Sequence, residues 1–379
     1  MNITGILAEY DPLHSGHIYH LSQAKEDADG IVVLLSGHLT QRGSFAKYDK
    51  WSRARAALLA GADLVLELSS SFCCASAERF ASAAVSVFDR MGVVSRLSFG
   101  SESGDIFAIQ KVASLLDGLE GTANFEREIK RGASYPKARQ TALGEAGELL
   151  CHPNNTLAVE YCKAIRRQRA KLSPHTVKRV GATHNSFQTD VTVSSSYLRA
   201  HEGEMARYLK KPILNCFTTP SRPPEILFLS QLRRYSVADF AELPDVSNGL
   251  EHRLWRAAQN ACSLDDFYSI AKTKCVTHSR LRRISIYALL GIRKSDLLPV
   301  PPYACVLGFT PVGRQILRMT NADSLVLSPN FAEIAKRFPK EAGWDALATD
   351  FFYLGTNPIK KGGENYRRPP IQTSSETEG

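Results

Sequence analysis

The sequence has no apolar run that approaches the roughly 18 to 20 residues needed to span a membrane as a helix. Its first residues, MNITGILAEYDP, carry no basic region ahead of an apolar stretch, so we expect a strand there and no secretory signal. The eight cysteines are scattered and form no CxxC pair, which argues against a structural zinc site or a disulfide framework. These absences favour a protein of the reducing cytoplasm that binds no membrane.

Among the charged residues, the acidic ones are scarce: 38 Asp and Glu stand against 47 Lys and Arg, for a formal net charge of +9. Such an excess favours a polyanionic partner, nucleic acid before a membrane surface. At 379 residues, the chain is long enough for two or three domains. It can bury a full core without the help of disulfides or metal.

Over the first 200 residues, short apolar runs alternate with helical patterns. Near-continuous apolar runs separated by helices are typical of a parallel sheet covered on both faces. We therefore predict an α/β fold, with a Rossmann-like parallel-sheet domain over residues 1–200 and a ligand site at the carboxyl ends of its strands. The expected strands are 3–8, 30–36, 63–68, 96–100 and 176–181, with helices such as 51–60 and 75–91 between them.

From about residue 201, the pattern becomes mainly helical. The stretches with helical spacing are 249–262, 264–272 and 279–290. Pro-rich connectors at 219–224 and 298–302 bracket them. We expect a second, mainly helical and basic domain over residues 201–358. The polar, Gly- and Pro-rich stretch 359–379 is expected to be a disordered tail.

The motif AEYDPLHSGH, residues 8–17, directly follows the first expected strand. His14, His17 and His20 recur every three residues at the start of the next expected helix, and Gly16 lets a ligand approach the backbone. A helix N-terminus favours phosphate, and two imidazoles there can donate to phosphate oxygens during attack on an α-phosphorus. We predict this catalytic role for His14 and His17; the alternative is a chance pair of surface or metal-binding histidines.

A hydroxyl-rich motif, VSSSYLR, covers residues 193–199. Ser194, Ser195 and Ser196 open a helical segment, and Arg199 follows one turn later. Hydroxyls at a helix start can cap the helix or hold a phosphate, and the sequence alone leaves both roles open. Together with HSGH, the motif resembles the phosphate clamp of the HIGH-type nucleotidyltransferase superfamily, which implies that these four residues bind ATP.

Two basic runs contain no acidic residue: 163–179 and 272–294 each hold seven Lys or Arg. Solvated helix faces usually mix both signs of charge, so these runs favour contacts with a phosphate backbone. From the second run, we expect Lys274, Arg280, Arg282 and Arg283 to bind RNA. We predict no metal held by protein ligands.

Further motifs narrow the resemblance. In chain order, they are SGHLTQRGSFAKYDK at 36–50, SAERFA at 76–81, FGSESGD at 99–105, HPNNTLAVEY at 152–161, KRVGATHN at 178–185, GLEHR at 249–253 and KCVTHSRLRR at 274–283. In this order, they resemble the tRNA(Met) cytidine acetate ligase family, a branch of the HIGH-type nucleotidyltransferases. The resemblance runs from residue 3 to about residue 325.

The resemblance implies a two-step ligase. Its members activate acetate with ATP as acetyl-adenylate and release pyrophosphate. They then pass the acetyl group to the exocyclic amine of the wobble cytidine of elongator tRNA(Met), forming N4-acetylcytidine. By match to the motifs, ATP with Mg²⁺ would contact Leu7, Ala8, Glu9, Tyr10, Asp11, Pro12, Leu13, His14, Ser15, Gly16, His17, Ile18, Tyr19 and His20, together with Gly100, one of Asn154 and Asn155, and Arg179.

The chain departs from the usual family motifs at several positions. Asp11 stands in place of Asn, and its carboxylate would repel a triphosphate unless Mg²⁺ or another cation intervenes. His38 replaces Asn in the second loop, and Asn185 replaces Asp after the fifth expected strand, which argues against a metal or base role there. Two other functions stay open: an adenylyltransferase acting on a small phosphorylated metabolite, and a non-catalytic protein that binds ATP and tRNA.

Overall fold

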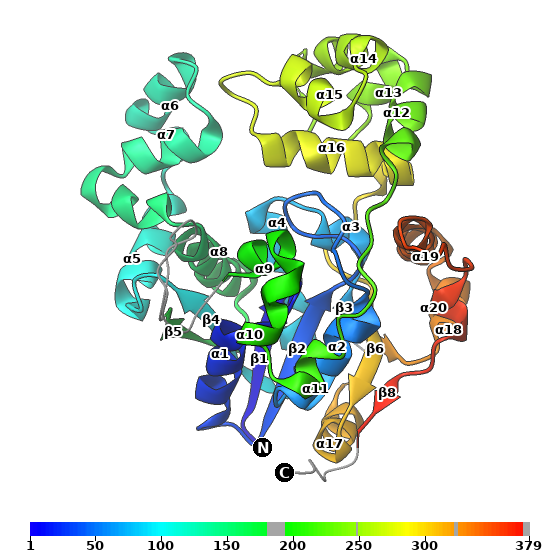
Figure 1. The fold of residues 1–379 in the computed structure, drawn as a ribbon. Helices are drawn as coiled ribbons and strands as arrows, with labels where there is room; N and C mark the ends of the chain where they lie inside the picture. Colours follow the sequence, from blue (N-terminus) through cyan, green and yellow to red (C-terminus); the bar gives the residue numbers. More distant parts are fainter. Residues whose placement is uncertain (180–193, 248, 322–324, 374–379) are drawn as a thin grey trace.

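The computed structural model describes residues 1–179, 194–247, 249–321 and 325–373. In this part of the chain, eight strands form one sheet in the order β5-β4-β1-β2-β3-β6-β7, with β8 paired to β6 (Figure 1). None of the helices described here is both long and apolar enough to span a membrane. The strands are β1 (Ile3–Ala8), β2 (Gly30–Ser36), β3 (Leu64–Leu68), β4 (Val94–Ser101), β5 (Ser173–Lys178), β6 (Tyr303–Phe309), β7 (Val326–Ser328) and β8 (Ile371–Gln372).

Strands β1 to β5 all run parallel. From β1, the chain moves through β2 and β3 on one side and then crosses back to β4 and β5 on the other. The strand order therefore reverses between β1 and β4, and ligands of such sheets bind outside the carboxyl ends of the strands at the reversal. The predicted Rossmann-like parallel sheet is confirmed, and this reversal brings the turn after β1 close to the end of β4.

The sequence of β2 is a nearly continuous apolar run because both faces of this strand are buried. All seven of its residues are buried. Val32 and Leu34 belong to the hydrophobic core on one face of the sheet, whereas Val33 and Leu35 belong to the core on the other face. Because successive side chains of a strand point to opposite faces, a strand between two cores has no polar face.

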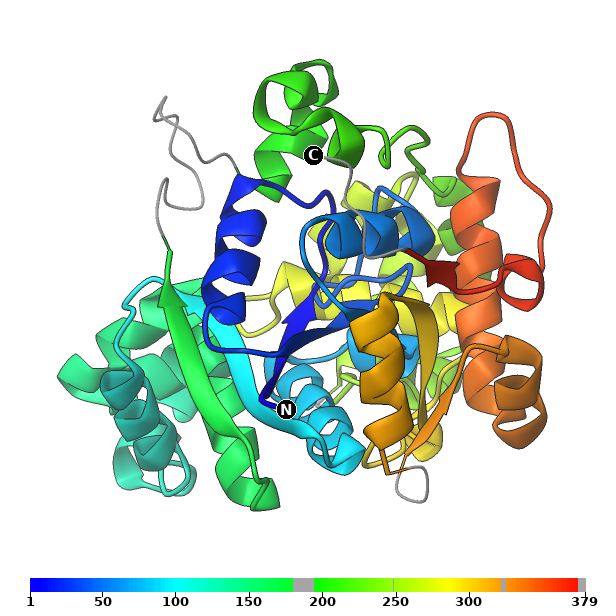
Figure 2. The ribbon, with the colours of Figure 1, turned by 90° about the horizontal axis from the view of Figure 1, so that it is seen from below.

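Helices cover both faces of the sheet, as the view from below in Figure 2 shows. The first layer consists of α1 (Ser15–Lys25), α2 (Lys50–Leu59), α9 (Ser195–Ala200), α10 (Met205–Tyr208) and α11 (Lys211–Leu214). The second layer consists of α3 (Ser70–Cys73), α4 (Ala77–Met91), α5 (Ile106–Leu116) and α8 (Pro153–Gln168). Each layer packs on one of the two cores, so the parallel sheet is shielded from water on both sides.

Two helical groups extend beyond these layers (Figure 1). One is an arm of α6 (Ala123–Lys130), α7 (Tyr135–Ala142) and the 3₁₀ helix Gly144–Cys151. The other is an upper bundle of α12 (Glu225–Arg234), α13 (Val237–Ala241), α14 (Leu250–Asn260), α15 (Leu264–Ala271) and α16 (His278–Leu290). Within the bundle, α16 lies closest to the sheet layers, and its Tyr287 hydroxyl donates to the carbonyl oxygen of Cys74 at 2.5 Å.

The sheet crosses the domain boundary expected near residue 200. Strand β6 pairs antiparallel with β3, and both β7 and β8 pair with β6. The helices of this region are α17 (Pro311–Met319), α18 (Phe331–Arg337), α19 (Pro339–Leu354) and α20 (Glu364–Arg367). Residues 303–372 therefore return to the first sheet, and they do not extend the helical bundle to residue 358.

The expected disordered tail is wrong for residues 359–373. Asn365 in α20 is buried, and its Oδ1 accepts a hydrogen bond from the Thr349 hydroxyl of α19 at 2.9 Å. Ile371 and Gln372 extend the sheet as β8. Tertiary partners from α19 and β6 thus order a segment whose composition alone favours disorder, while residues 374–379 lie outside the described part of the chain.

Candidate functional site

His14 and His17 form a reciprocal cap at the start of α1. The Nδ1 atom of His14 accepts the amide of Gly16 at 3.1 Å, and the Nδ1 atom of His17 accepts the amide of His14 at 3.3 Å. The two imidazoles stack, with ring centroids 3.7 Å apart. The sequence pattern had placed His14 on the helix, but the structure shows it as the N-cap residue that precedes α1. Because each Nδ1 is an acceptor, each neutral ring carries its proton on Nε2.

Burial keeps both rings uncharged. It lowers the pKa of His14 to about 3, helped by the positive charges of Arg179 and Arg199. Burial also lowers the pKa of His17 well below its usual value, and the neighbouring His14 and Arg179 act in the same direction. At neutral pH, the pair therefore presents two Nε2–H donors at a helix N-terminus, which is itself the positive end of the helix dipole.

The two arginines come from different elements: Arg179 directly follows β5, and Arg199 lies on α9. The backbone amide of Arg179 donates to the carbonyl oxygen of Ser101 at 2.9 Å, which keeps Arg179 beside the end of β4. A Cβ on Gly100 would lie 3.6 Å from the Cγ of Arg179, so the arginine stem passes directly over this glycine. Arg199 donates to the backbone carbonyl of Asp11 and, at 3.0 Å, to the Ser196 hydroxyl.

The second motif docks directly on the first. Ser194 caps α9 by accepting the amide of Tyr197 at 3.2 Å. The Ser195 hydroxyl donates to the carbonyl oxygen of Pro12 at 3.1 Å. The HSGH and VSSSYLR motifs, which together resemble a phosphate clamp, therefore lie in contact in the structure. The hydroxyls of Ser194 and Ser195 form hydrogen bonds to the backbone of the protein. Val193 and residues 180–185, including Asn185, lie outside the described residues.

The Asp11 carboxylate is turned into the protein. It is almost fully buried, and its two oxygens accept the backbone amides of Lys47 and Tyr48 at 2.9 to 3.0 Å. The guanidinium of Arg199 lies 3.7 Å from one of these oxygens. The negative charge is therefore compensated by local donors, and the expected repulsion of a triphosphate does not follow from this geometry.

A reciprocal clamp holds the turn after β4 against the start of α8. Asn155 is buried, and its Oδ1 accepts the amides of Glu102 and Ser103 at 2.9 and 3.1 Å. In return, the Glu102 carboxylate accepts the amide of Asn155 at 2.8 Å and the side-chain amide of Asn154 at 2.7 Å. The Oδ1 of Asn155 is thus committed to the turn. Asn154 is the more exposed of the two asparagines.

The remaining residues of 7–20 have different surroundings. The ring of His20 faces the sheet, where its Nε2 is 2.9 Å from the Ser98 hydroxyl, and burial lowers its pKa to about 4. Leu13 lies entirely in the hydrophobic core. Glu9 accepts the amide of Gln41 at 2.8 Å, and burial raises the pKa of its carboxyl. Tyr19, by contrast, is exposed.

Two buried polar side chains support the site, although neither was among the predicted site residues. Arg53 is fully buried and donates to the carbonyl oxygens of Glu9 at 2.7 Å and Ser36 at 2.9 Å, so it ties the carboxyl ends of β1 and β2 together. The Nδ1 of His38 lies 3.0 Å from the Thr349 hydroxyl of α19. His38 therefore belongs to the junction with the C-terminal segment. A basic residue within the apolar spacing of α2 was the one local signal for Arg53.

The structure divides the basic residues expected to bind RNA. Arg283 is buried and pairs with Asp245 at 2.7 Å, and Arg280 donates to the backbone carbonyl of Asp245 at 2.7 Å. Lys274 and Arg282 are exposed. Arg283 is therefore unsuited to contact RNA, because its guanidinium is used inside the bundle.

Part of the first basic run is paired with acidic side chains that lie outside the run. Lys163 is buried between Glu78 and Glu160, at 3.0 Å from each carboxylate. Arg166 pairs with Asp117 at 2.8 Å. The expected contact with a phosphate backbone does not fit Lys163, which is buried, whereas Arg166 is exposed but already pairs with Asp117.

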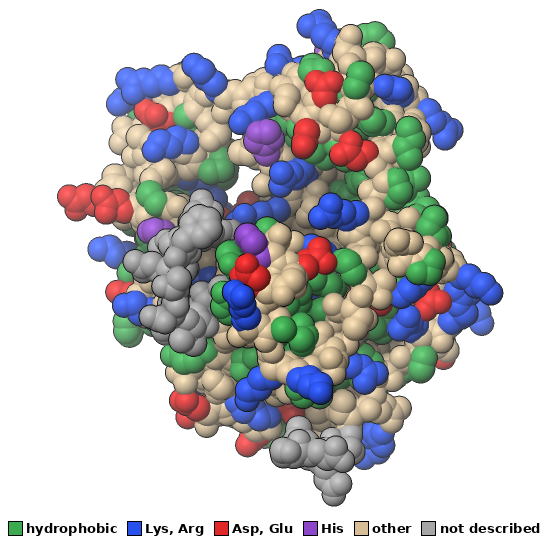
Figure 3. All heavy atoms as spheres, viewed as in Figure 1, with side chains coloured by type: hydrophobic (Ala, Val, Ile, Leu, Met, Phe, Trp, Pro, Cys, Tyr) green, Lys and Arg blue, Asp and Glu red, His purple; other side chains and the backbone are tan. Residues whose placement is uncertain are grey.

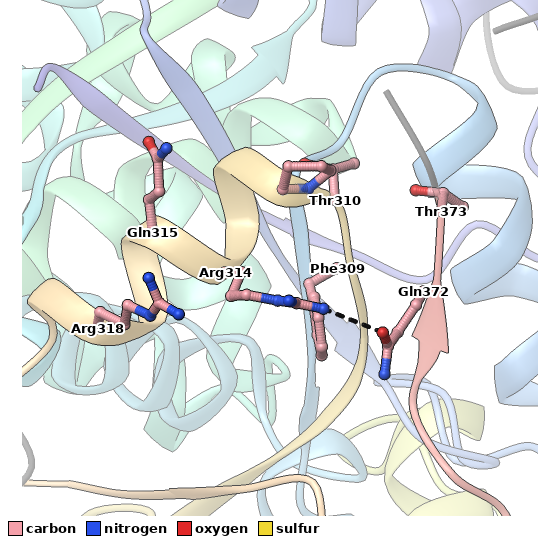
Figure 4. A pocket seen from close by; sticks show the side chains of 8 residues that line it. Phe309, Thr310, Arg314, Gln315, Arg318, Gln372 and Thr373 are labelled. Atoms are coloured by element: carbon pink, nitrogen blue, oxygen red, sulfur yellow. Dashed lines mark hydrogen bonds between the residues drawn. The ribbon is translucent and has the colours of Figure 1, made fainter. Parts of the chain in front are cut away.

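A surface cavity of about 460 Å³ lies away from these motifs, between α17 and β8 (Figure 4). It is lined by Phe309, Thr310, Arg314 and Arg318 among others, and Arg314 donates to Gln372 at 3.0 Å. Phe309 pairs with Leu64, the first residue of β3. The cavity therefore lies at the amino ends of the parallel strands, opposite to the edge that carries HSGH.

Whole-chain comparisons point to one family. The chain matches the family model described as HIGH Nucleotidyl Transferase over residues 1–366. It is 33% identical to the tRNA(Met) cytidine acetate ligase of Clostridium tetani, over 98% of this chain and 100% of that protein. It is 32% identical to the protein of the same name from Alkaliphilus metalliredigens, over 98% of each chain.

A solved structure shares the complete fold. Thermotoga maritima TmcAL, bound with alpha-thio ATP, has a TM-score of 0.87 and 30% sequence identity, over 99% of this chain and 100% of that one. The apo form of the same protein gives a TM-score of 0.89 at 29% identity. Because the sequence match, the motifs and the fold all extend along nearly the whole chain, the protein belongs to the tRNA(Met) cytidine acetate ligase family of HIGH nucleotidyltransferases.

Proposed function

We propose that this chain is an ATP-dependent ligase that activates acetate and acetylates the wobble cytidine of elongator tRNA(Met). The observation that carries the proposal is the stacked, neutral pair His14 and His17 at the N-terminus of α1, with Arg179 and Arg199 near enough to lower the pKa of both rings. Two aligned N–H donors, a helix dipole and two guanidinium groups form a site for a polyphosphate. Membership of the family supports acetate and tRNA(Met) as the other substrates.

In the first step, an acetate oxygen would attack the α-phosphorus of ATP. The bond from that phosphorus to the bridging oxygen breaks, and pyrophosphate leaves with the electron pair. The Nε2–H groups of His14 and His17 would stabilise the negative charge that develops on the phosphate oxygens, a role in which a neutral donor suffices. Arg179 and Arg199 would bind the outer phosphates through their planar forks.

We infer the other ATP contacts from which backbone and side-chain groups are exposed and not already used by hydrogen bonds within the protein. We assign Gly100 to the close backbone approach and Asn154, rather than Asn155, to a direct contact, since the Oδ1 of Asn155 is already used by the turn. The backbone of residues 7–20 would line the nucleotide, whereas His20 and Leu13 would support it from behind.

Magnesium would enter bound to the triphosphate. Among the described residues, no group of three or more His, Cys, Asp and Glu side chains could hold a metal ion, and Asp11 already accepts backbone amides. Mg²⁺ typically keeps several waters and binds through substrate phosphates, which fits a site without a cluster of carboxylates.

In the second step, the exocyclic amine of the cytidine would attack the acetyl carbonyl of the adenylate. The carbon–nitrogen bond forms, AMP leaves, and the amine loses one proton to solvent or a neighbouring base. The upper bundle α12–α16, with the exposed Lys274 and Arg282, would bind the tRNA. A tRNA substrate also supports a cytoplasmic location for the enzyme.

The decisive experiment is pyrophosphate release from ATP and labelled acetate, with and without tRNA(Met). The ligase predicts release that requires acetate, with the label recovered on the wobble cytidine. Release that ignores acetate would point to an adenylyltransferase with another acceptor. Tight binding of ATP and tRNA without any release would make the chain a non-catalytic binding protein.

The role of the histidines is tested by His17→Ala. Loss of one charge-stabilising donor should lower the rate of acetate-dependent pyrophosphate release about 100-fold or more. Because the substitution also removes half of the reciprocal cap, we expect about 1 kcal/mol of destabilisation, and thermal unfolding must confirm that the variant is folded at the assay temperature. The exposed His252→Ala on α14 is the matched control. A folded His17→Ala enzyme with the wild-type rate would refute the role.

A further inference from the structure

The loop between β2 and α2, residues 37–49, links the nucleotide-binding turn to the upper bundle. The backbone amide of Gln41 donates to the Glu9 carboxylate at 2.8 Å, and its side-chain amide donates to the carbonyl oxygen of Ala75 at 2.8 Å. The tip of the loop is closed by the Thr40 amide, which donates to the carbonyl oxygen of Ser44 at 2.8 Å. The loop tip is therefore held in place next to a residue of the nucleotide motif.

On its other side, the tip touches the backbone of α16. Gly43 has a φ of +81° and packs so closely that a Cβ there would lie 2.4 Å from the backbone nitrogen of Arg283 and 2.9 Å from the Cβ of Arg282. Only glycine allows both this conformation and this approach. Arg42 lies between these anchors, one residue from Gln41 and one from Gly43.

Two arginines flank this contact: Arg42 precedes Gly43 in the chain, and the Cβ of Arg282 lies against Gly43. Arg42 and Arg282 are both exposed, and within the described residues neither makes a hydrogen bond or an ion pair. Their neighbours differ: Arg280 and Arg283 are both bonded to Asp245. Figure 3 shows Lys and Arg side chains around the hollow between the upper bundle and the sheet layers. The fold thus leaves these two guanidinium groups for an external anion.

We propose that Arg42 and Arg282 form a phosphate-binding pair that holds the tRNA backbone at the entrance of the reaction site. The inference rests on the proposed function. Arginine binds phosphate through two parallel hydrogen bonds, so a pair on a rigid contact fixes both position and direction of a strand. Because Gln41 joins Arg42 to Glu9, a phosphate held here brings the adjoining nucleotide to the turn that carries HSGH. Arg42 is a positioning residue in this scheme.

The test is binding of tRNA(Met) to Arg42→Glu and Arg282→Glu, measured over a range of salt concentrations. Each substitution should weaken binding at least about tenfold and reduce the slope of log affinity against log salt by about one, the effect of losing one phosphate contact. Arg42→Lys, which keeps the charge but not the fork, should recover most of the slope and only part of the affinity. The KM for tRNA should rise more in the two glutamate variants than in Arg42→Lys.

Arg318→Glu is the matched control, because Arg318 is an exposed arginine on α17 at the far edge of the sheet. If it weakens tRNA binding as much as Arg42→Glu, the effect is one of net charge and the proposal is overturned. Wild-type affinity and slope in Arg42→Glu would overturn it too. If Arg42→Glu fails to fold, Arg42→Gln is judged by the same criteria. Failure of the wild-type chain to bind tRNA would refute the proposed function itself, a separate result.

Discussion

His14 and His17 depend on each other for their orientation and their charge. Each Nδ1 accepts a backbone amide of the same turn, so the tautomer of each ring is set by a local hydrogen bond. With ring centroids 3.7 Å apart, protonation of one imidazole would disfavour protonation of the other, which agrees with the lowered pKa of His17. The motif is therefore best understood as a pair of neutral donors, and no general base is required of it.

Asp11 provides a prediction at the scale of one residue. Asp11→Ala should lower the free energy of unfolding by about 1–3 kcal/mol, because it leaves the buried amides of Lys47 and Tyr48 without acceptors. Asp11→Asn should cost much less, since one amide oxygen can accept from both. Chemical denaturation of the two variants measures the difference.

If Asp11 instead acted through its charge on a bound cation, the order would change. Asp11→Asn would then fold with wild-type stability but lose nucleotide affinity, and added magnesium would not restore it. Equal destabilisation by Asn and Ala would contradict the hydrogen-bonding role. These outcomes separate a structural carboxylate from one that binds a metal.

Between elements, the clamp of Glu102 and Asn155 joins the end of β4 to the start of α8. The carboxylate at the N-terminus of α8 satisfies its first amides and interacts favourably with the helix dipole. That helix end is therefore used for structure, whereas the N-terminus of α1 presents imidazole donors. Two helix N-termini close to one site thus serve different purposes.

Glu102→Gln is the prediction that belongs to this scale. Asn154 and Asn155 donate to different oxygens of the Glu102 carboxylate, so a glutamine would place its NH2 group against one of these donors and lose that bond. We expect the KM for ATP to rise roughly tenfold with a smaller change in kcat, because the turn that carries Gly100 shifts while the histidine pair stays in place. Steady-state pyrophosphate release gives both constants.

Glu126→Gln serves as its control, because Glu126 is an exposed glutamate on α6, away from the clamp. It should leave both constants as in the wild type. A Glu102→Gln enzyme that matched this control would show that the clamp does not position the nucleotide.

For the molecule as a whole, the C-terminal segment completes the first sheet. β8 pairs with β6, Asn365 bonds Thr349, and the Arg368 guanidinium lies 5.1 Å from the centre of the Trp51 ring on α2. His38 reaches the same α19 from the loop after β2. Residues far beyond the nucleotide motifs therefore stabilise the layer that carries them.

Truncation after residue 358 tests this connection. Removal of α20 and β8 exposes an edge of β6 and takes away the buried Asn365, one of the partners of the Thr349 hydroxyl, so we expect a loss of about 2–4 kcal/mol and a fall in Tm of about 5 °C or more. Truncation after Thr373 keeps all of these contacts and is the control. Equal Tm values for both truncations in differential scanning calorimetry would mean that the segment contributes no stability.

Much of the part of the chain that carries the nucleotide motif could be predicted, because the sequence patterns that indicate it are local. The apolar runs of β1 and β2 and the glycine and histidines of HSGH lie within a few residues of one another, so their pattern alone indicates a strand, a turn and a capped helix. The position of HSGH at the carboxyl end of a parallel sheet follows from the topology rules for such sheets. The sequence by itself therefore determined the fold class, the nucleotide motif and the family.

Only the tertiary structure decided which charged and polar groups far apart in the sequence pair with each other. Arg283 is neutralised by Asp245, 38 positions earlier, whereas Arg282 beside it has no such partner in the part of the chain that the structure describes, although the two look alike in the sequence. The direction of the Asp11 carboxylate depends on the amides of Lys47 and Tyr48, and the order of β8 depends on β6. Such pairings follow from the path of the folded chain, and no short-range pattern encodes them.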